Sequence, residues 1–535
     1  MTWGELAVLR ALKDPLDRYV YLRDLRAVDE PGFFRLLQAH SQELLPVVYT
    51  PTVGDAALSY HALPITPQGL YVTSDDAGRV ADVLAAWPHK VRCAACAPQA
   101  ASCLRHARRP LRCARRATWR PRHSFADWAP APRARAPPRH LAAAQHVSVV
   151  VLTDGERVLG LGDLGAGGLA ISEGKILLYT VCAGVPPAAC LPLCLDVGTD
   201  NAALLDDPGY KGLRRARLRG PTYDALVAEL VDALQRRYPH CVLQWEDFGA
   251  HNAFMLLERY RNTMVSRTRA CPISRSQPAL LIQPTFSYIS QCCFNDDIQG
   301  TASVAVAGLL SALRCAGLRP VDARLLFYGA GEAGTGIGAL WALYLQRRHG
   351  VAEAEARARC LYMDSKGLLC ASRADARAGR LPAHKRPFAH DVPFQPDLLA
   401  AVRALRPNAL VGVSAQAGAF TPAVLAAMAD SAPRPSIFAL SNPTSLAECT
   451  AAEAVAAAPG RVLFASGSPF DDVPGGAPGG KAALRPSQAN NAYIFPALGF
   501  GAALSHATSL PDETFILAAE VCPSRARIAA MIRII

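Results

Sequence analysis

Hydrophobic and polar positions are regularly patterned over residues 1–89. Apolar side chains recur at helical spacing in the stretches GELAVLRALKDPLDRY and EPGFFRLLQAHSQELL, so each is predicted to be an amphipathic helix. Further along, an apolar run ends in a glycine turn at VSVVVLTDGERVLGLGDLG, which predicts a buried strand. Helix and strand signals then continue to about Tyr260.

From Phe294 the pattern becomes that of an open α/β domain. A helical stretch, TASVAVAGLLSALRCAGL, precedes RLLFYGAGEAGTGIGALWALYL, which reads as strand, glycine turn and helix. Further apolar runs of strand length occur at ALVGVSA and SIFALSN, as parallel strands covered on both faces require. We therefore predict an α/β fold class, with an N-terminal domain over 1–292 and a doubly wound nucleotide-binding domain over 293–535.

Two segments interrupt this pattern. Arg, Pro, Ala and Cys dominate residues 90–145, and such a composition buries too little apolar surface to offset the entropy of ordering. We expect a disordered insertion there, or non-coding sequence translated in error. A second interruption, 262–292, separates two motifs that should lie close together. The chain ends in a short basic stretch, PSRARIAAMIRII, so we also expect a C-terminal truncation.

The net charge of the chain does not alter the predicted fold or its expected partners. The net charge of +12 lies wholly in residues 90–145, where Lys90 and twelve arginines stand against Asp127. This segment would be the only basis for a nucleic-acid-binding protein, and we expect no nucleic-acid partner. It also holds Cys93, Cys96, Cys103 and Cys113 around His106. Their spacing fits no common zinc finger.

Three features of the sequence bear on the cellular compartment of the protein. Sixteen cysteines without the regular spacing of a small secreted scaffold predict reduced thiols. Unbroken apolar runs stay shorter than the roughly 18 residues that a membrane span needs. The N-terminus resembles neither a signal peptide nor a transit peptide. We expect a soluble intracellular protein of the cytosol or of an organelle, chloroplast or mitochondrion, with no membrane partner.

A glycine-rich turn is the first candidate site. Residues 329–334, GAGEAG, match G-x-G-x-x-G between a predicted strand and a predicted helix, where backbone N–H groups can approach a pyrophosphate. A purely structural glycine turn is the alternative. Asp364 follows a second strand, LYM, and an acid there favours NAD. Lys366 and Lys385 could offset its charge, so the residues alone leave NAD and NADP open.

Four carboxylates form the second candidate site. Glu246 and Asp247 stand in WEDFGAHNAF, and Asp296 and Asp297 in FNDDIQG. Acids beside Phe and Trp suggest burial, and buried carboxylates need a cation. Oxygen ligands suit Mg²⁺ or Mn²⁺, and the alternative is a pair of acidic turns.

Together these motifs resemble the malic enzyme family. The matching phrases run in family order over about four fifths of the chain: YTPTVG, TDGERVLGLGDLG, LPLCLDVGTDNAALL, QWEDFGAHNAF, FNDDIQGTA, GAGEAGTGIG, FALSNPTSLAECT, LFASGSPF and NNAYIFP. The resemblance implies a malic-enzyme N-terminal domain followed by a Rossmann-type domain. It also implies oxidative decarboxylation of malate to pyruvate with a nicotinamide cofactor and a divalent metal ion.

The resemblance also implies residue roles. It makes Tyr49 the general acid and Lys175 the general base, assisted by Asp296. Malate is held by Arg157, Asn442 and Asn491, and the metal by Glu246, Asp247 and Asp297. The implied cofactor contacts are Gly329, Gly331, Glu332, Ala333, Gly334, Asp364, Ser365 and Lys385. Because Ser365 and Lys385 match the family's NADP-using members, NADP is expected rather than NAD. We further expect burial near the metal to lower the pKa of Lys175.

Alternative readings stay open at this stage. A malolactic-type member of the family would use NAD and yield lactate. A truncated or wrongly translated chain would be catalytically impaired or would act only as a subunit partner. The family also implies a homo-oligomer, dimer or tetramer, if the termini permit it.

Overall fold

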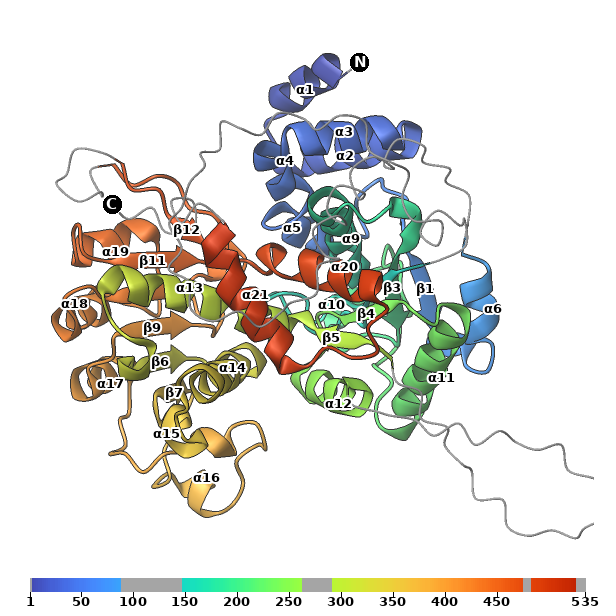
Figure 1. Ribbon diagram of the computed structural model, residues 1–535. Helices are drawn as coiled ribbons and strands as arrows, with labels where there is room; N and C mark the ends of the chain where they lie inside the picture. Colours follow the sequence, from blue (N-terminus) through green and yellow to red (C-terminus); the bar gives the residue numbers. More distant parts are fainter. Residues whose placement is uncertain (1, 88–146, 262–290, 475–482, 526–535) are drawn as a thin grey trace, which may run out of the picture.

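The computed structural model (Figure 1) describes residues 2–87, 147–261, 291–474 and 483–525. The predicted insertion at 90–145 lies outside these residues, and so does most of 262–292. Only Gln291 and Cys292 of the second segment are described. Both are buried, and the backbone N–H of Leu243 donates to the carbonyl of Cys292 at 2.9 Å.

The first unit is built on a parallel five-stranded sheet in the order β1-β3-β2-β4-β5. Its strands are β1 (Leu70–Thr73), β2 (Val149–Thr153), β3 (Cys190–Asp196), β4 (Val242–Trp245) and β5 (Cys293–Asn295). Every residue of β2, β3, β4 and β5 is buried, as expected for a parallel sheet covered by helices on both faces. The strand predicted before the TDGERVLG turn is therefore confirmed as β2.

Helices of the first unit surround this sheet (Figure 1). They are α1 (Thr2–Ala11), α2 (Pro15–Val28), α3 (Glu30–Ala39), α4 (Ser41–Val48), α5 (Thr52–Leu58), α6 (Val80–Ala85), α9 (Leu169–Ala183), α10 (Ala202–Asp206), α11 (Pro221–Arg237) and α12 (Ala250–Arg261). The α9 helix is buried from Leu169 to Thr180, so it runs through the core and not along the surface.

Both N-terminal helical stretches are interrupted where one helix was predicted. The first breaks because the side chain of Asp14 accepts from the N–H of Leu16 and Pro15 begins a new helix, the favoured arrangement at a helix start. The second breaks at His40, which ends α3 and begins α4. At Asp14, local capping therefore overrides a continuous apolar period.

The second unit is a seven-stranded sheet in the order β12-β11-β10-β9-β6-β7-β8. Its strands are β6 (Leu325–Tyr328), β7 (Cys360–Asp364), β8 (Gly367–Leu368), β9 (Ala409–Gly412), β10 (Ser436–Ala439), β11 (Leu463–Ser466) and β12 (Ser487–Gln488). All pairs are parallel except β7 with β8. The β6 strand lies between β7 and β9, so strand order reverses beside it, which is the position where doubly wound sheets bind ligands. The predicted α/β fold class is confirmed.

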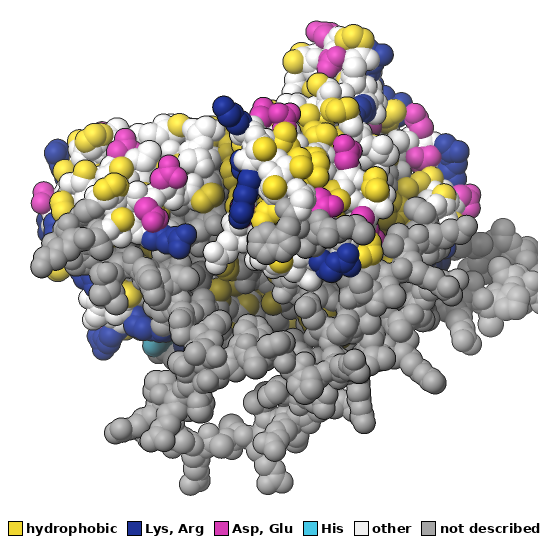
Figure 2. Space-filling view, turned by 90° about the horizontal axis from the view of Figure 1, so that it is seen from above, with side chains coloured by type: hydrophobic (Ala, Val, Ile, Leu, Met, Phe, Trp, Pro, Cys, Tyr) yellow, Lys and Arg dark blue, Asp and Glu magenta, His cyan; other side chains and the backbone are white. Residues whose placement is uncertain are grey.

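Helices also cover the second sheet, and two of them reach beyond it. The helices of this half are α13 (Thr301–Ala316), α14 (Glu332–His349), α15 (Glu353–Ala358), α16 (Ala374–Arg377), α17 (Leu398–Leu405), α18 (Pro422–Ser431), α19 (Ala451–Ala457), α20 (Phe495–Ser505) and α21 (Asp512–Arg525). The α20 helix packs against α9, β4 and β2 of the first unit, and α21 packs against α13 and α14. Seen from above, apolar side chains show in the furrow between the two halves (Figure 2).

One helix is longer and more apolar than the sequence pattern suggested. Asp296–Ala316, a π-helical turn followed by α13, is long and apolar enough to cross a membrane by composition. However, 78% of its apolar window is buried inside the fold. It is a core helix that connects the two units.

A buried ion pair ties the N-terminal helices to the core. Arg23 on α2 forms a salt bridge with Glu173 on α9, and the two side chains are 7% and 1% exposed. Arg23 also donates to the carbonyl of Thr66 at 2.7 Å, and the N–H of Gln68 donates to Glu173. Burial opposes the charge of Arg23, but Glu173 outweighs it and raises the pKa of Arg23.

Removing one partner of this pair should therefore cost more than removing both. Arg23→Met leaves the carboxylate of Glu173 buried without its cation, and we expect a loss of about 3–5 kcal/mol in the free energy of unfolding. The double variant Arg23→Met with Glu173→Leu should recover most of that loss. Urea unfolding followed by circular dichroism measures both. Equal stability of wild type and Arg23→Met would contradict the prediction.

Candidate active site

A cavity of about 200 Å³ lies between the two units. It brings together most of the candidate residues of both halves: Tyr49, Arg157, Lys175, Glu246, Asp247, Asp297, Gly331, Glu332, Ala333, Asn442 and Asn491. Asp296 stands behind its wall in contact with Lys175. The remaining cofactor candidates, Gly329, Gly334, Asp364, Ser365 and Lys385, do not line the cavity.

Three carboxylates converge on one side of this cavity. Glu246, Asp247 and Asp297 each offer an oxygen, and these oxygens lie within 4.8 Å of one another. Asp247 has a left-handed backbone (φ 56°), an uncommon conformation for a residue other than glycine. Its N–H donates to Asp297 at 2.7 Å, and its carboxylate accepts from the N–H of Leu159 at 2.8 Å.

The donor set of this cluster fits a hard divalent cation. The second carboxylate oxygen of Asp247 is buried and has no hydrogen-bond partner. Burial raises the pKa of Asp297 to about 6. Burial, followed by the charge of Asp297, raises the pKa of Asp247 well above its usual value. Three converging carboxylates, of which Glu246 and Asp247 are buried, form the all-oxygen donor set that Mg²⁺ or Mn²⁺ prefers.

Lys175 lies beside this cluster, 2% exposed in the middle of α9. Its Nζ is 2.8 Å from Oε1 of Glu246, and it pairs with Asp296. Burial disfavours its charge, but Asp296 and Glu246 outweigh burial and raise the pKa of Lys175 well above its usual value. The expected lowering of this pKa was for Lys175 beside a bound metal, and it stays a prediction; the protein groups alone shift the pKa upward. The carboxylates that reach Lys175 carry more negative charge than burial can offset.

Tyr49 faces the same lysine. It ends α4 and is 6% exposed, and Nζ of Lys175 lies 5.6 Å from the centre of its ring. Burial raises the pKa of Tyr49 above its usual value although the charge of Lys175 opposes the shift. The phenol is therefore held in its protonated form at neutral pH. Phe495 on α20 covers Lys175 from the other side, with its ring centre 4.5 Å from Nζ.

The two asparagines approach from the C-terminal half. The amide of Asn491 donates to Asp296 at 3.1 Å and to Oγ1 of Thr301 at 3.0 Å. The side-chain oxygen of Asn442 accepts from Ser468 at 2.6 Å. Asn491 therefore orients the carboxylate that Lys175 contacts.

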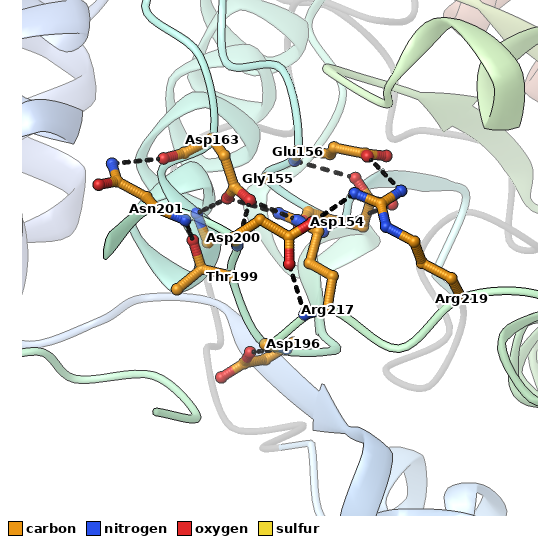
Figure 3. A network of polar contacts seen from close by, with 12 residues as sticks. Asp154, Gly155, Glu156, Asp163, Asp196, Thr199, Asp200, Asn201, Arg217 and Arg219 are labelled. Atoms are coloured by element: carbon orange, nitrogen blue, oxygen red, sulfur yellow. Dashed lines mark hydrogen bonds and ion pairs between the residues drawn. The ribbon is translucent and has the colours of Figure 1, made fainter. Parts of the chain in front are cut away.

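The loop that carries Arg157 is held at both of its ends by one arginine (Figure 3). Arg217 donates twice to the carboxylate of Asp163, at 2.7 and 2.8 Å, and once to the carbonyl of Asp154 at 2.9 Å. Between these ends, the N–H of Arg157 donates to the carbonyl of Asp247 at 3.1 Å. The loop is thus connected to a candidate metal ligand.

Several supporting residues were not found from the sequence. Gln244 donates to Glu246 at 2.8 Å and accepts from the hydroxyl of Tyr179 at 2.7 Å. Alternation along β4 puts Gln244 and Glu246 on the same face, so the spacing was a usable signal. Phe495 and Arg217 carry no such local signal.

The glycine turn has the geometry of a nucleotide loop. Gly329 has φ 118°, and a Cβ on Gly334 would lie 2.3 Å from the carbonyl oxygen of Gly329. Both positions therefore require glycine. A Cβ on Gly331 would meet nothing within 4 Å, which leaves open space at the start of α14. Burial, with Asp297 close by, raises the pKa of Glu332 to about 8.

Asp364, Ser365 and Lys385 lie at the end of β7. Asp364 is the last residue of that strand, and Ser365 beside it is exposed. Nζ of Lys385 is 2.9 Å from Oδ2 of Asp364.

Comparisons with known proteins agree with this arrangement. The family model "Malic enzyme, N-terminal domain" matches residues 28–103 and 139–261, and "Malic enzyme, NAD binding domain" matches 298–531. An NADP-dependent malic enzyme of Mus musculus is 40% identical over 97% of this chain and 76% of its own length. A chloroplastic NADP-dependent malic enzyme of Oryza sativa is also 40% identical, over 97% of this chain and 67% of its own.

Solved structures support the fold. A malic enzyme of Entamoeba histolytica superposes with a TM-score of 0.51 at 24% identity, over 72% of this chain and 65% of its own. An NAD-dependent malic enzyme of Thermotoga maritima has a TM-score of 0.51 at 20% identity, over 74% of this chain and 82% of its own.

The carboxylate cluster predicts opposite effects of one substitution with and without metal. Asp297→Asn removes a repelling charge, so the metal-free variant should melt at the same temperature as wild type or higher. Mn²⁺ at a hundred times its Kd should stabilise wild type by about 2.7 kcal/mol, and the variant should lose most of that gain. Thermal melts with and without Mn²⁺ measure both effects. Asp232→Asn, which changes an exposed acid on α11, is the control and should keep the full gain; an unchanged gain in Asp297→Asn would contradict the site.

Proposed function

The chain belongs to the malic enzyme family, and we propose that it oxidises and decarboxylates malate to pyruvate with NADP and a bound Mg²⁺ or Mn²⁺. The observation that carries this proposal is the single cavity in which Lys175, Tyr49 and the carboxylate cluster meet the nucleotide loop. An acid, a base, a metal site and a hydride acceptor are the parts that the reaction needs.

Oxidation begins at C2 of malate. Arg157 pairs with a carboxylate of the substrate, and Asn442 and Asn491 hold it from the opposite side of the cavity. Lys175 removes the proton of the C2 hydroxyl while the hydride leaves C2 for the nicotinamide. When bound, the divalent ion supplies stabilisation for the negative charge that develops on the C2 oxygen.

Lys175 must be neutral before it can accept that proton. Glu246 contributes to holding the proton on Lys175, and Glu246 is also one of the three proposed metal ligands. Ligation would offset the charge of this carboxylate and weaken its hold. Asp296, oriented by Asn491, stays beside Lys175 to receive the proton.

Decarboxylation leaves an enol that must be protonated at C3. Tyr49 is the group for this step because it lines the cavity with its ring beside Lys175 and its hydroxyl is protonated at neutral pH. The rings of Tyr49 and Phe495 flank Lys175, and this limits access of water to the reacting atoms.

The partners, oligomeric state and cellular location of this chain are proposed from the family as well. We propose that malate and pyruvate are the small-molecule partners and that the chain forms a homo-oligomer, dimer or tetramer. A location in the cytosol or in an organelle also stays a prediction; the relative of Oryza sativa is named chloroplastic.

Absorbance at 340 nm with malate, Mn²⁺ and either NADP or NAD tests the overall function. We expect a rise that requires the metal and is faster with NADP. No rise with either cofactor from folded protein would favour a catalytically impaired chain. Lactate without net reduction of free cofactor would instead identify a malolactic-type member.

Two substitutions separate the chemical steps. Lys175→Ala should abolish malate oxidation, since a general base contributes about 10²- to 10⁴-fold. Tyr49→Phe should slow decarboxylation and protonation more than hydride transfer. Steady-state rates with malate deuterated at C2 measure this: the isotope effect should shrink in Tyr49→Phe because hydride transfer no longer limits the rate. Equal loss of both steps would count against the role of Tyr49.

A further inference from the structure

A buried carboxylate stands behind the wall of the cavity in the second unit. Glu448 lies between β10 and α19 and is 0% exposed. A Cβ on Gly412, the last residue of β9, would lie 2.4 Å from Cδ of Glu448, so the carboxylate requires glycine at the end of that strand. The N–H of Phe420 also donates to the carbonyl of Glu448 at 2.8 Å. Glu448 is therefore anchored to the connection that follows β9.

The side chain of Glu448 holds two turns at once. Its Oε1 accepts from the N–H of Ser414 at 2.9 Å and from the hydroxyls of Ser414 and Ser441, at 3.2 and 2.5 Å. Its Oε2 accepts from the N–H of Ser441 at 3.4 Å. The hydroxyl of Ser441 in turn accepts from the N–H of Ala415 at 2.9 Å. One carboxylate thus joins the turn after β9 to the turn after β10, its neighbour in the sheet.

These two turns form one side of the proposed malate site. Ala415, Ser441 and Asn442 line the cavity, and Asn442 is the residue proposed to hold malate. Ala415 has a left-handed backbone (φ 54°), a conformation that a residue with a Cβ keeps only where its surroundings impose it. Its hydrogen bond to Ser441 imposes it here, so the shape of this wall depends on the contacts that converge on Glu448.

The same turns touch the loop that carries Arg157. A Cβ on Gly160 would lie 2.9 Å from the carbonyl oxygen of Asn442 and 3.2 Å from Cβ of Ala415. Gly160 and Arg157 belong to one loop of the first unit. The position of the Asn442 turn therefore sets where the Arg157 loop rests against the second unit.

The partners of Glu448 require a group that only accepts hydrogen bonds. Two of them are backbone N–H groups, and each faces a different carboxylate oxygen. A glutamine has one accepting and one donating end, so in either orientation its NH₂ would face one of these N–H groups. Burial raises the pKa of Glu448, and the hydroxyl of Ser441 and backbone N–H groups oppose this shift. Neutral donors thus stabilise the carboxylate.

We propose that Glu448 is a positioning residue for malate. It fixes the Asn442 turn and, through the contact of that turn with Gly160, the distance between Asn442 and Arg157. These two groups receive malate from opposite sides of the cavity. Glu448 itself does not line the cavity, so it acts on the substrate only through other residues. The inference rests on the proposed function, because it takes malate as the ligand.

Binding of malate without turnover tests the inference. Malate is titrated by calorimetry into the full chain saturated with Mn²⁺ and NADPH, which is already reduced and accepts no hydride. Glu448→Gln should weaken malate binding about 10- to 100-fold, the loss expected when a buried N–H is left without an acceptor. The Kd of Mn²⁺, titrated separately, should stay that of wild type, because Glu448 does not touch the carboxylate cluster.

Three further variants distinguish positioning from a structural role. Glu453→Gln makes the same chemical change on an exposed acid of α19, where glutamine also completes the capping box with Thr450, and should bind malate as wild type does. Ser414→Ala removes one hydroxyl from Glu448 and should weaken malate about 2- to 10-fold; it replaces Glu448→Gln if that variant does not fold. In an Asn442→Ala background, Glu448→Gln should add less than its loss in wild type, because both act on one contact.

The outcomes separate the inference from the function on which it rests. A folded wild type that does not bind malate would overturn the proposed function, and the role of Glu448 with it. Where wild type binds malate, that role would be overturned by an unchanged Kd in Glu448→Gln and Ser414→Ala, by equal weakening of malate and Mn²⁺, or by losses that simply add in the double variant.

Discussion

A cation buried among carboxylates is the constraint on which the rest of this structure depends. Lys175 sits within the core at 2% exposure, and its neighbours Glu246 and Asp296 are 1% and 0% exposed. One ammonium cannot compensate four acids in so small a space, and burial makes any uncompensated charge costly. A divalent ion bound by Glu246, Asp247 and Asp297 would supply the positive charge that compensates these acids. The two sheets, the loop of Arg157 and the returning α20 helix all serve to hold these groups at fixed distances.

Much of the fold could be predicted because it follows from local periodicity. The strands β2, β6, β9 and β10 are short apolar runs that end in glycine or polar turns, and each was found where the pattern placed it. The breaks at Asp14 and His40 were missed because an amphipathic period continues across them. At Asp14 a capping side chain decides the boundary, and its hydrogen bond is visible only in the fold.

In the candidate site, too, some residues could be predicted from the local sequence and others are recognised only in the fold. The residues proposed to touch substrate, metal or cofactor stand in long motifs, so the family resemblance pointed to Tyr49, Lys175 and Asp297. Arg217, which holds the loop of Arg157, is an ordinary arginine in its local sequence. Only the fold shows that it bridges two carboxylates. The pKa of Lys175 depends on the fold for a related reason: distant segments bring the carboxylates that set its direction.

The C-terminal α20 helix packs back against the first unit, and this contact constrains the order in which the parts of the chain can fold during synthesis. Asn491 and Asp296 are 195 positions apart, and Phe495 covers a lysine on α9. While the ribosome is still producing the second sheet, α9 has no α20 against it and its apolar surface faces solvent. Nascent chains at that stage expose a large apolar face, the condition under which misassembly competes with folding. Long-range closure of this kind is also slow, so α9 is expected to reach its native packing only after α20 has been synthesised.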